Sequence, residues 1–187
     1  GLIPENFSPN SHLNVWWLGK CNHEWIATPN SRTKGTNCPY CANQKILEGF
    51  NDLKTVNPEL AKEWHPTKNG QLTPQKAIAG GEKKAWWLGK CGHEWEARIG
   101  DRVYGSGCPY CTNQKVLPGF NDLLTTHPEL AKEWHPTKNG QLTSQNVFAG
   151  SQKKVWWLGK CGHEWEAQLT NRAKGSECPY CTNRKVL

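Results

Sequence analysis

The sequence predicts a tandem array of small α+β repeats, and three observations support this fold class. A 27-residue segment occurs three times at a spacing of seventy residues, beginning at Val15, Ala85 and Val155. All nine cysteines of the 187-residue chain fall within these three segments. Each repeat is near the size at which a hydrophobic core alone gives only marginal stability. The repeats should therefore need stabilisation beyond their apolar cores.

The third copy, VWWLGKCGHEWEAQLTNRAKGSECPYC, shows what that stabilisation is. It joins Cys-x-His to Cys-Pro-Tyr-Cys and so supplies two pairs of donors for one tetrahedral Zn²⁺. Four protein ligands leave no open position for water or substrate, so we expect three structural zinc ions. The predicted ligands are Cys21, His23, Cys38 and Cys41 in the first copy, Cys91, His93, Cys108 and Cys111 in the second, and Cys161, His163, Cys178 and Cys181 in the third.

Three other uses of the cysteines fit less well. Disulfides leave one of three cysteines per copy unpaired, and they give the histidine no role. Cys-Pro-Tyr-Cys resembles a glutaredoxin site, but that motif needs a thioredoxin-like βαβ setting. A zinc deaminase needs an open metal position, which Cys21, Cys91 or Cys161 would fill. We therefore interpret each segment as a structural metal site.

The seventy-residue period divides the chain into fingers and connectors. Alternating side chains predict two strands per finger, for example over 84–90 and 94–99, with Cys-x-His at the hairpin turn. We expect a short helix after the second cysteine pair, over 43–45, 113–115 and 183–185. Each finger is then a treble-clef-like zinc ribbon, a β-hairpin plus a short helix. The predicted boundaries are 2–47, 72–117 and 142–187 for the fingers, and 48–71 and 118–141 for the connectors.

Two features of the fingers leave alternatives open. One ring of each Trp-Trp pair should lie over the metal site, and the other could pack on the connector or on a partner. The segments that differ most between copies, 28–31, 98–101 and 168–171, are interpreted as variable loops. An arginine follows each loop, at positions 32, 102 and 172. It could pair with Glu24, Glu94 or Glu164, or it could bind a phosphate.

The connectors differ from each other at four positions and are interpreted as two short helices each. In the second connector, Asn121 or Asp122 should cap the first helix, and Pro128 should open the next. Leu130 and Trp134 should pack on a flanking finger, as should Leu60 and Trp64 in the first connector. His65 and His135, each followed by proline, are expected to be C-terminal caps rather than metal ligands.

The net charge of +7 is concentrated on the fingers. The three fingers carry +2, +3 and +4 in chain order, whereas each connector carries −1. This placement predicts that the fingers face a polyanion. The residues expected to contact nucleic acid are Arg32, Lys34, Lys45, Lys83, Lys84, Arg98, Arg102, Lys115, Lys153, Lys154, Arg172, Lys174, Arg184 and Lys185.

Composition also bears on location. The chain has no apolar run of about eighteen residues and no charged-then-apolar leader, so we expect neither a membrane span nor secretion. Thiolate ligands predict a reducing intracellular compartment, the cytoplasm or the nucleoid or nucleus. Methionine is absent, from which we expect a processed chain or a fragment of a longer array. We expect a monomer.

The hairpin motif WWLGKCGHEW, the R-x-x-G-x-x-CPYC motif and the intervening HPELAKEW together resemble a known family. This is the treble-clef zinc-finger, or probable zinc-ribbon, repeat family found as tandem arrays, and the resemblance covers nearly the whole chain. Some members look like arrays beside nuclease-like domains. The resemblance therefore implies nucleic-acid handling, with a nuclease-like domain or another protein as a further partner, but it identifies no binding residue.

Two functional classes remain. The first is a modular array that binds duplex DNA through basic finger surfaces and variable loops, and the charge placement favours it. The second is a protein-interaction scaffold that uses exposed tryptophans and the acidic connectors. Single-stranded nucleic acid or RNA is a further alternative, because aromatic rings beside lysines suit stacked bases. An enzyme is not expected, because the sequence shows no nucleophile, carboxylate pair or open metal site.

Overall fold

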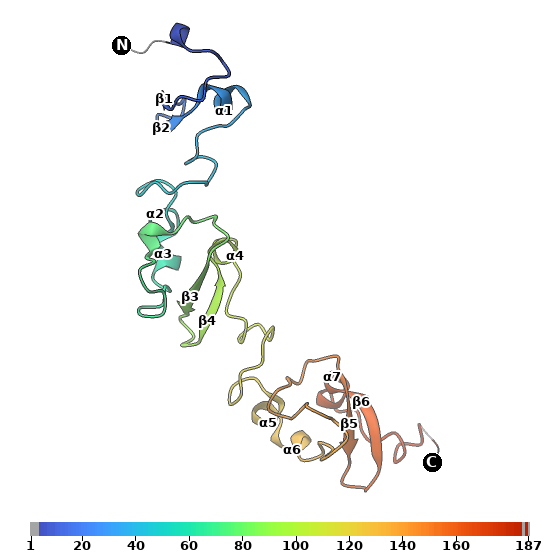
Figure 1. Cartoon of the computed structure of the whole chain (residues 1–187). Coiled ribbons are helices and arrows are strands. Elements are labelled where there is room, and N and C mark those ends of the chain that lie inside the picture. Colours follow the sequence, from blue (N-terminus) through green and yellow to red (C-terminus); the bar gives the residue numbers. More distant parts are fainter. Residues whose placement is uncertain (1–3, 185, 187) are drawn as a thin grey trace. The chain divides into compact units, whose positions relative to one another are not determined.

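The structure is a computed structural model that describes residues 4–184 and 186. The chain divides into two compact units, residues 1–106 and 107–187, and each is taken by itself. The described residues form three two-stranded antiparallel sheets, two in the first unit and one in the second (Figure 1). Elements of the first unit are η1 (Pro4–Asn6), β1 (Val15–Leu18), β2 (Glu24–Ala27), α1 (Pro29–Thr33), α2 (Leu53–Val56), α3 (Pro58–Ala61), η2 (Pro74–Lys76), β3 (Lys84–Leu88), β4 (Glu94–Arg98) and α4 (Ile99–Val103). Those of the second are α5 (Leu123–Thr126), α6 (Pro128–Ala131), β5 (Lys154–Leu158), β6 (Glu164–Gln168) and α7 (Leu169–Ala173).

Each hairpin buries one face, as the alternating side chains predict. In the second hairpin Ala85 and Trp87 are 2% and 0% exposed, whereas Trp86 between them is only partly buried. Trp87 lies opposite Trp95 across the strands, and its indole N–H donates to the Ala97 carbonyl at 3.2 Å. The tryptophan pair therefore splits between the two faces of the sheet, as expected.

The short helix of each finger lies before the second cysteine pair. Helices α1, α4 and α7 occupy most of the segments interpreted as variable loops. Helix α1 begins because Thr28 accepts a hydrogen bond from the Ser31 N–H and Pro29 stands at the first helical position. Helix α4 has no such cap. Instead Ile99 is fully buried and its N–H donates to the Lys83 carbonyl at 2.9 Å.

The helix predicted after the second cysteine pair is wrong. Asn43 has a φ of 53°, and Asn113 and Asn183 have a φ of 54°. The N–H groups of Gln44 and Lys45 both turn back to the Pro39 carbonyl, at 2.8 and 3.1 Å. A left-handed asparagine ends the turn, so a right-handed helix cannot continue there. Lys185, the last residue of the predicted third helix, lies outside the described residues.

The connectors form the expected short helices. Asp122 caps α5 by accepting hydrogen bonds from the N–H groups of Thr125 and Gly119, at 2.9 and 2.6 Å. Burial raises the pKa of Asp122, but these bonds and that of the Thr125 hydroxyl outweigh it, so the pKa lies below its usual value. Asn121 instead binds the loop after the cysteine pair, through the carbonyls of Tyr110 and Lys115.

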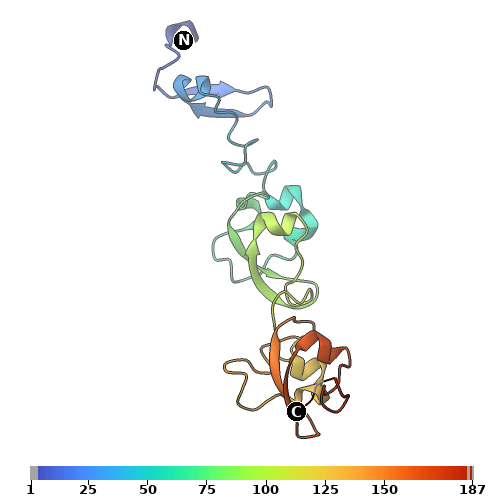
Figure 2. The same cartoon turned by 90° about the vertical axis from the view of Figure 1, so that its right-hand side faces the viewer.

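Each connector packs on the hairpin that follows it. In the second unit Trp134 bridges Trp157, and the Leu158 N–H donates to the Glu133 carbonyl at 2.8 Å. In both views α5, α6 and α7 flank the third hairpin (Figure 1, Figure 2). The expected stripe, Leu130 and Trp134, packs on one core made of Leu123, Val147, Val155, Trp157, Trp165, Leu169 and Cys178.

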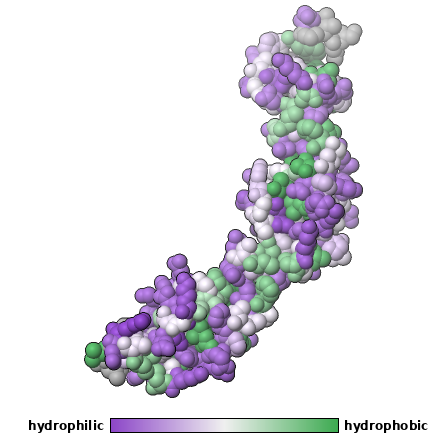
Figure 3. Space-filling view, turned by 180° about the vertical axis from the view of Figure 1, so that it is seen from behind, coloured by the Kyte–Doolittle hydropathy of each residue, from purple (hydrophilic) through white to green (hydrophobic). Residues whose placement is uncertain are grey.

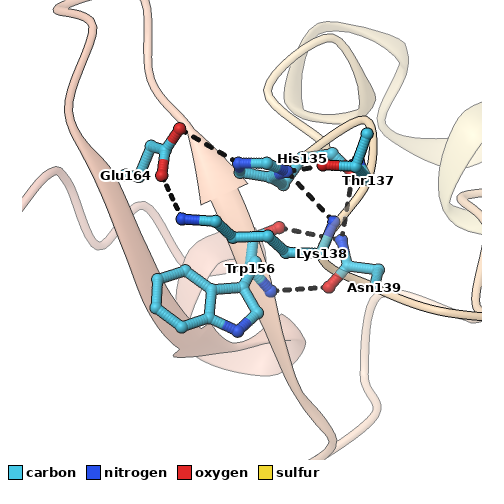
Figure 4. A network of polar contacts seen from close by, with 6 residues as sticks. All are labelled: His135, Thr137, Lys138, Asn139, Trp156 and Glu164. Atoms are coloured by element: carbon cyan, nitrogen blue, oxygen red, sulfur yellow. Dashed lines mark hydrogen bonds and ion pairs between the residues drawn. The ribbon is translucent and has the colours of Figure 1, made fainter.

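His135 organises the turn after α6 (Figure 4). Its Nδ1 accepts hydrogen bonds from the N–H groups of Thr137 and Lys138, both at 3.2 Å. That nitrogen therefore carries no proton, and Nε2 faces a Glu164 carboxylate oxygen at 3.2 Å. His135 thus caps the following turn rather than the carbonyls of its helix, and His65 makes the same bonds in the first unit.

The same turn covers the outer tryptophan of the third hairpin. The Asn139 side chain bonds both the N–H and the carbonyl of Trp156, at 2.7 and 2.9 Å. The Lys138 ammonium lies 4.6 Å from the centre of the Trp156 ring and also pairs with Glu164. The outer ring therefore packs on the connector, which was one of the two alternatives.

None of the described helices has the length and apolar character that a membrane span requires. On the face shown in Figure 3, hydrophobic residues form patches that hydrophilic residues separate.

Trp134→Ala should destabilise the second unit by about 2 to 3 kcal/mol, less than a fully buried ring because Trp134 is half-buried. The lost contact is the edge-to-face packing on Trp157, at 5.8 Å between ring centres. Urea unfolding of the zinc-loaded protein measures the difference. Leu124→Ala, at a side chain that is 40% exposed, is the control and should change stability by less than about 0.5 kcal/mol.

Candidate metal centres

Each finger brings together the three cysteines and the histidine predicted from the sequence. In each set the four ligand atoms lie within 4.8 Å of one another. The sets are Cys21, His23, Cys38 and Cys41; Cys91, His93, Cys108 and Cys111; and Cys161, His163, Cys178 and Cys181. The six cysteines of the first and third sets form no disulfide.

The spacing of the donor atoms fits a tetrahedral zinc ion. His23 Nδ1 lies 3.5 Å from the Cys38 sulfur and 3.4 Å from the Cys41 sulfur. In the third finger His163 Nδ1 lies 3.5 Å from the sulfurs of both Cys178 and Cys181. Typical Zn–S and Zn–N bonds at a tetrahedral angle place sulfur and nitrogen about 3.6 Å apart. The histidines therefore present Nδ1 as the ligand.

Crowding of the thiols is a second sign of a cation site. Burial and the neighbouring Cys21 and Cys38 raise the pKa of Cys41 to about 11. Cys161, Cys178 and burial raise the pKa of Cys181 to about 11. Three adjacent thiols cannot all ionise by themselves, because each thiolate repels the next. A divalent ion supplies the charge that allows all three to deprotonate and bind.

A glycine that the sequence analysis missed allows the first ligand pair to form. A Cβ at Gly159 would lie 2.8 Å from the Trp165 ring and 3.1 Å from the Cys161 sulfur. Gly19 and Gly89 are equally confined, at 2.8 and 2.9 Å from the equivalent tryptophan rings. The recurrence of Leu-Gly-Lys-Cys in all three copies was the available signal.

The residue inside Cys-x-His must adopt a left-handed backbone. Its φ is 59° at Asn22, 79° at Gly92 and 77° at Gly162. Glycine and asparagine tolerate this conformation better than other residues do. The turn therefore explains why the variable position of this motif is Gly or Asn.

The first connector also holds the metal site that precedes it. The Phe50 ring packs edge-on against the His23 ring, with 4.2 Å between the ring centres. The Asn51 side chain donates to the carbonyls of Tyr40 and Lys45, at 3.0 and 2.9 Å. The connector thus supports the histidine ligand and fixes the loop that follows Cys41.

The comparison with known families agrees with this geometry. A family described as a probable treble-clef zinc finger domain matches residues 1–44, 60–114 and 130–184. The chain belongs to this family. Each matched range of the zinc finger contains one complete four-ligand set, so the array has three sites for structural Zn²⁺. A search of curated proteins found no match.

Two arginines of this zinc-finger array are buried and leave the predicted nucleic-acid surface. The Arg102 guanidinium lies 5.2 and 5.0 Å from the ring centres of Trp87 and Trp95. It donates to the Ser106 carbonyl and pairs with the carboxylate of Glu63, and its side chain is 8% exposed. Arg172 has the same environment, with Glu133 as its partner. These arginines are therefore structural, and their partner is a connector glutamate rather than Glu94 or Glu164.

Arg32 differs from the other two. It lies 5.2 Å from the rings of both Trp17 and Trp25 and donates to the Thr36 carbonyl. No described residue supplies it with a carboxylate.

The remaining predicted cations are at the surface. Those with exposed side chains are Lys34, Lys45, Lys83, Lys84, Arg98, Lys115, Lys153, Lys154, Lys174 and Arg184. Only Lys84 among them approaches a described carboxylate, with 3.9 Å to Glu96. Lys185 lies outside the described residues. In the segments interpreted as loops, Ile99 and Leu169 are fully buried, so only part of each segment can meet a partner.

Purified protein should contain three zinc ions, and Cys181→Ala should lower that number to two. The third site would lose one of its four ligands, and the unit built on it should unfold at lower urea concentration. Elemental analysis and native mass spectrometry measure the stoichiometry. Fewer than three tightly bound ions in the unmodified chain, or disulfides detected by mass, would contradict the assignment.

Gly159→Ala should weaken zinc binding in the third finger and destabilise it by about 1 to 3 kcal/mol, because the added methyl group would overlap the Trp165 ring. Competition with a chelator measures the affinity. Gly150→Ala is the matched control, since a Cβ there would lie an ordinary 3.6 Å from the Phe148 ring. Equal effects of the two substitutions would show that the close approach is unimportant.

Arg172→Ala should destabilise the second unit by about 3 to 5 kcal/mol, because it leaves the carboxylate of Glu133 without its partner. Lys132→Ala removes an exposed partner of Glu129 and should change stability by at most about 0.5 kcal/mol. Urea unfolding with zinc in excess compares the two. A fully stable Arg172→Ala protein with weaker nucleic-acid binding would restore the phosphate-binding alternative.

Proposed function

We propose that the chain is a modular array that binds nucleic acid, and duplex DNA in preference, through the exposed cations of its fingers. The observation that carries this proposal is the unequal pairing of the basic residues. Four of the five connector lysines form ion pairs: Lys62 with Glu59, Lys132 with Glu129, Lys68 with Glu94 and Lys138 with Glu164. The connectors therefore use most of their positive charge internally.

The fingers keep their positive charge available. Lys83, Lys153 and Lys154 stand at the base of their hairpins with exposed side chains. None of them has a carboxylate partner among the described residues. Lys34, Lys174 and Arg184 are likewise exposed and without a described ion pair. Unpaired lysines can neutralise phosphates and release counterions, which is the main source of affinity for DNA.

The covered tryptophans favour a duplex over a single strand. Binding of single strands relies on exposed rings on which bases stack. In the second and third fingers, Lys68 and Lys138 lie over the rings of Trp86 and Trp156, each at 4.6 Å. These fingers offer cations rather than open stacking platforms. Base contacts would come from the exposed ends of the variable segments, such as Arg98 and Asn171.

We also propose that the array has no catalytic role. Four protein ligands would fill the coordination shell of each zinc ion, and a catalytic zinc needs a position for water or substrate. The ion would then supply rigidity rather than Lewis acidity. The proposed binding surface lies on the fingers that the ions stabilise.

Duplex binding should weaken steeply with salt, with a log–log slope of about −0.9 for each phosphate neutralised. Replacing both Lys153 and Lys154 with Gln should make this slope shallower by about 2. The matched control, Lys62→Gln with Lys132→Gln, removes cations that are already paired and should leave the slope unchanged. Fluorescence anisotropy at several salt concentrations measures both, with zinc content as the check on folding.

Three results would contradict the proposal. These are weak, salt-insensitive binding to duplex DNA, tighter binding to single strands or RNA, and equal losses in the test and control variants. The first result would favour a protein-interaction scaffold instead.

A further inference from the structure

The first finger exposes a face that the connectors cover in the other two fingers. Trp16 and Leu18 are each 70% exposed, and Ile26, opposite Trp16 on the neighbouring strand, is 48% exposed. In the second finger the equivalent residues Trp86 and Leu88 are partly buried. The first hairpin thus carries an apolar patch on the same side as its outer tryptophan.

The second finger shows how such a face is covered. The connector runs along the free edge of β3, where the Leu88 N–H donates to the Glu63 carbonyl at 2.8 Å. The His65 N–H donates to the Trp86 carbonyl at 3.0 Å. The Asn69 side chain then bonds both the N–H and the carbonyl of Trp86, at 2.7 and 2.9 Å. This is addition of an extended segment to a sheet edge.

Charged groups fix the register of that segment. The Glu63 carboxylate pairs with Arg102, which lies between two tryptophan rings. Lys68 pairs with Glu94 and covers the Trp86 ring, and His65 Nε2 lies 3.2 Å from the same glutamate. The third finger repeats these contacts with Glu133, His135, Lys138 and Asn139. The segment EWHPTKNG makes all of them in both fingers.

The first finger has the receiving groups without the segment. Arg32 stands between Trp17 and Trp25, as Arg102 does between its own rings, and it bonds the Thr36 carbonyl. Glu24 is exposed at the position equivalent to Glu94. Among the described residues, none pairs with the carboxylate of Glu24, covers Trp16 or supplies a carboxylate to Arg32. The acceptor is therefore already formed around the guanidinium.

We propose that the first hairpin is a docking site for a connector-type segment, Glu-Trp-His-Pro-x-Lys-Asn-Gly, supplied by another polypeptide. The segment adds its main chain to the free edge of β1. Its glutamate pairs with Arg32, its asparagine bonds the main chain of Trp16, and its lysine covers the Trp16 ring and meets Glu24. The contacts in the second and third fingers specify this occupant, residue by residue.

The probe is a synthetic peptide of residues 57–72, titrated into the zinc-loaded full chain. One peptide should bind per chain, because the other two hairpins already hold their own connectors. Hydrogen exchange should slow over residues 15–27. A peptide with Glu63→Gln should bind at least about tenfold more weakly, because it lacks the charged partner of the arginine. Calorimetry gives both the stoichiometry and the affinity.

Variants of the chain locate the site. Trp16→Ala should abolish binding while leaving the zinc content unchanged, since the ring is 70% exposed. Leu124→Ala, which also truncates an exposed apolar side chain, should bind the peptide normally. Glu24→Gln should weaken binding because it removes the partner of the peptide lysine.

Four outcomes would overturn the proposal. The first is no binding at millimolar peptide, and the second is binding that neither Trp16→Ala nor the Glu63→Gln peptide weakens. The third is a dimer of the chain that Trp16→Ala dissolves and the peptide does not, which would make a second copy the occupant. The last is protection of residues 15–27 by an oligonucleotide but not by the peptide.

Discussion

The need to hold three thiolates and an imidazole at one point is the constraint on which the fingers depend. The first finger buries few apolar side chains, mainly Trp25 at 4% and Cys38 at 6% exposure. So small a core cannot offset the conformational entropy of ordering a finger by itself. The ligand geometry follows from this need. Gly19 admits the Trp25 ring beside the Cys21 sulfur, and a left-handed Asn22 turns the chain so that His23 reaches the same ion.

Around this site, a buried arginine joins the finger to its connector. A guanidinium between two indole rings loses its water, so it needs a carboxylate and a carbonyl in return. Glu63 and Ser106 supply them for Arg102. The pair carries little net stability of its own compared with an apolar alternative. Its value is that only one register of the connector along β3 satisfies the charge, so it specifies which segment packs there.

The sequence predicted the features that repeat and that depend on local chemistry. The ligand sets, the hairpins, the Asp122 cap and the helix beginning at Pro128 follow from spacing and residue type, and the structure confirms them. The position of the finger helix did not follow, because the deciding feature is the burial of Ile99 or Leu169, which is a tertiary contact. The left-handed asparagine after the cysteine pair could have been suspected, since Asn recurs there in every copy.

The partner of the arginine was beyond sequence reasoning for a related reason. Glu63 lies 39 positions before Arg102, whereas Glu94 is close in sequence and on the same hairpin. Local spacing favoured the nearer carboxylate. The outer face of the hairpin, where Glu94 points, is instead occupied by His65 and Lys68. Only the path of the connector shows which glutamate faces which cation.

The first connector touches both of its neighbours, and this has a consequence for how the array comes apart. Phe50 and Asn51 hold the metal site before it, and Glu63 and Trp64 hold the hairpin after it. Loss of the first ion should therefore loosen a segment that the second hairpin also needs, so melting of one finger is transmitted to the next. A cut placed between connector and hairpin would sever the strand-edge pairing. The smallest piece expected to fold faithfully contains a hairpin together with the connector that precedes it.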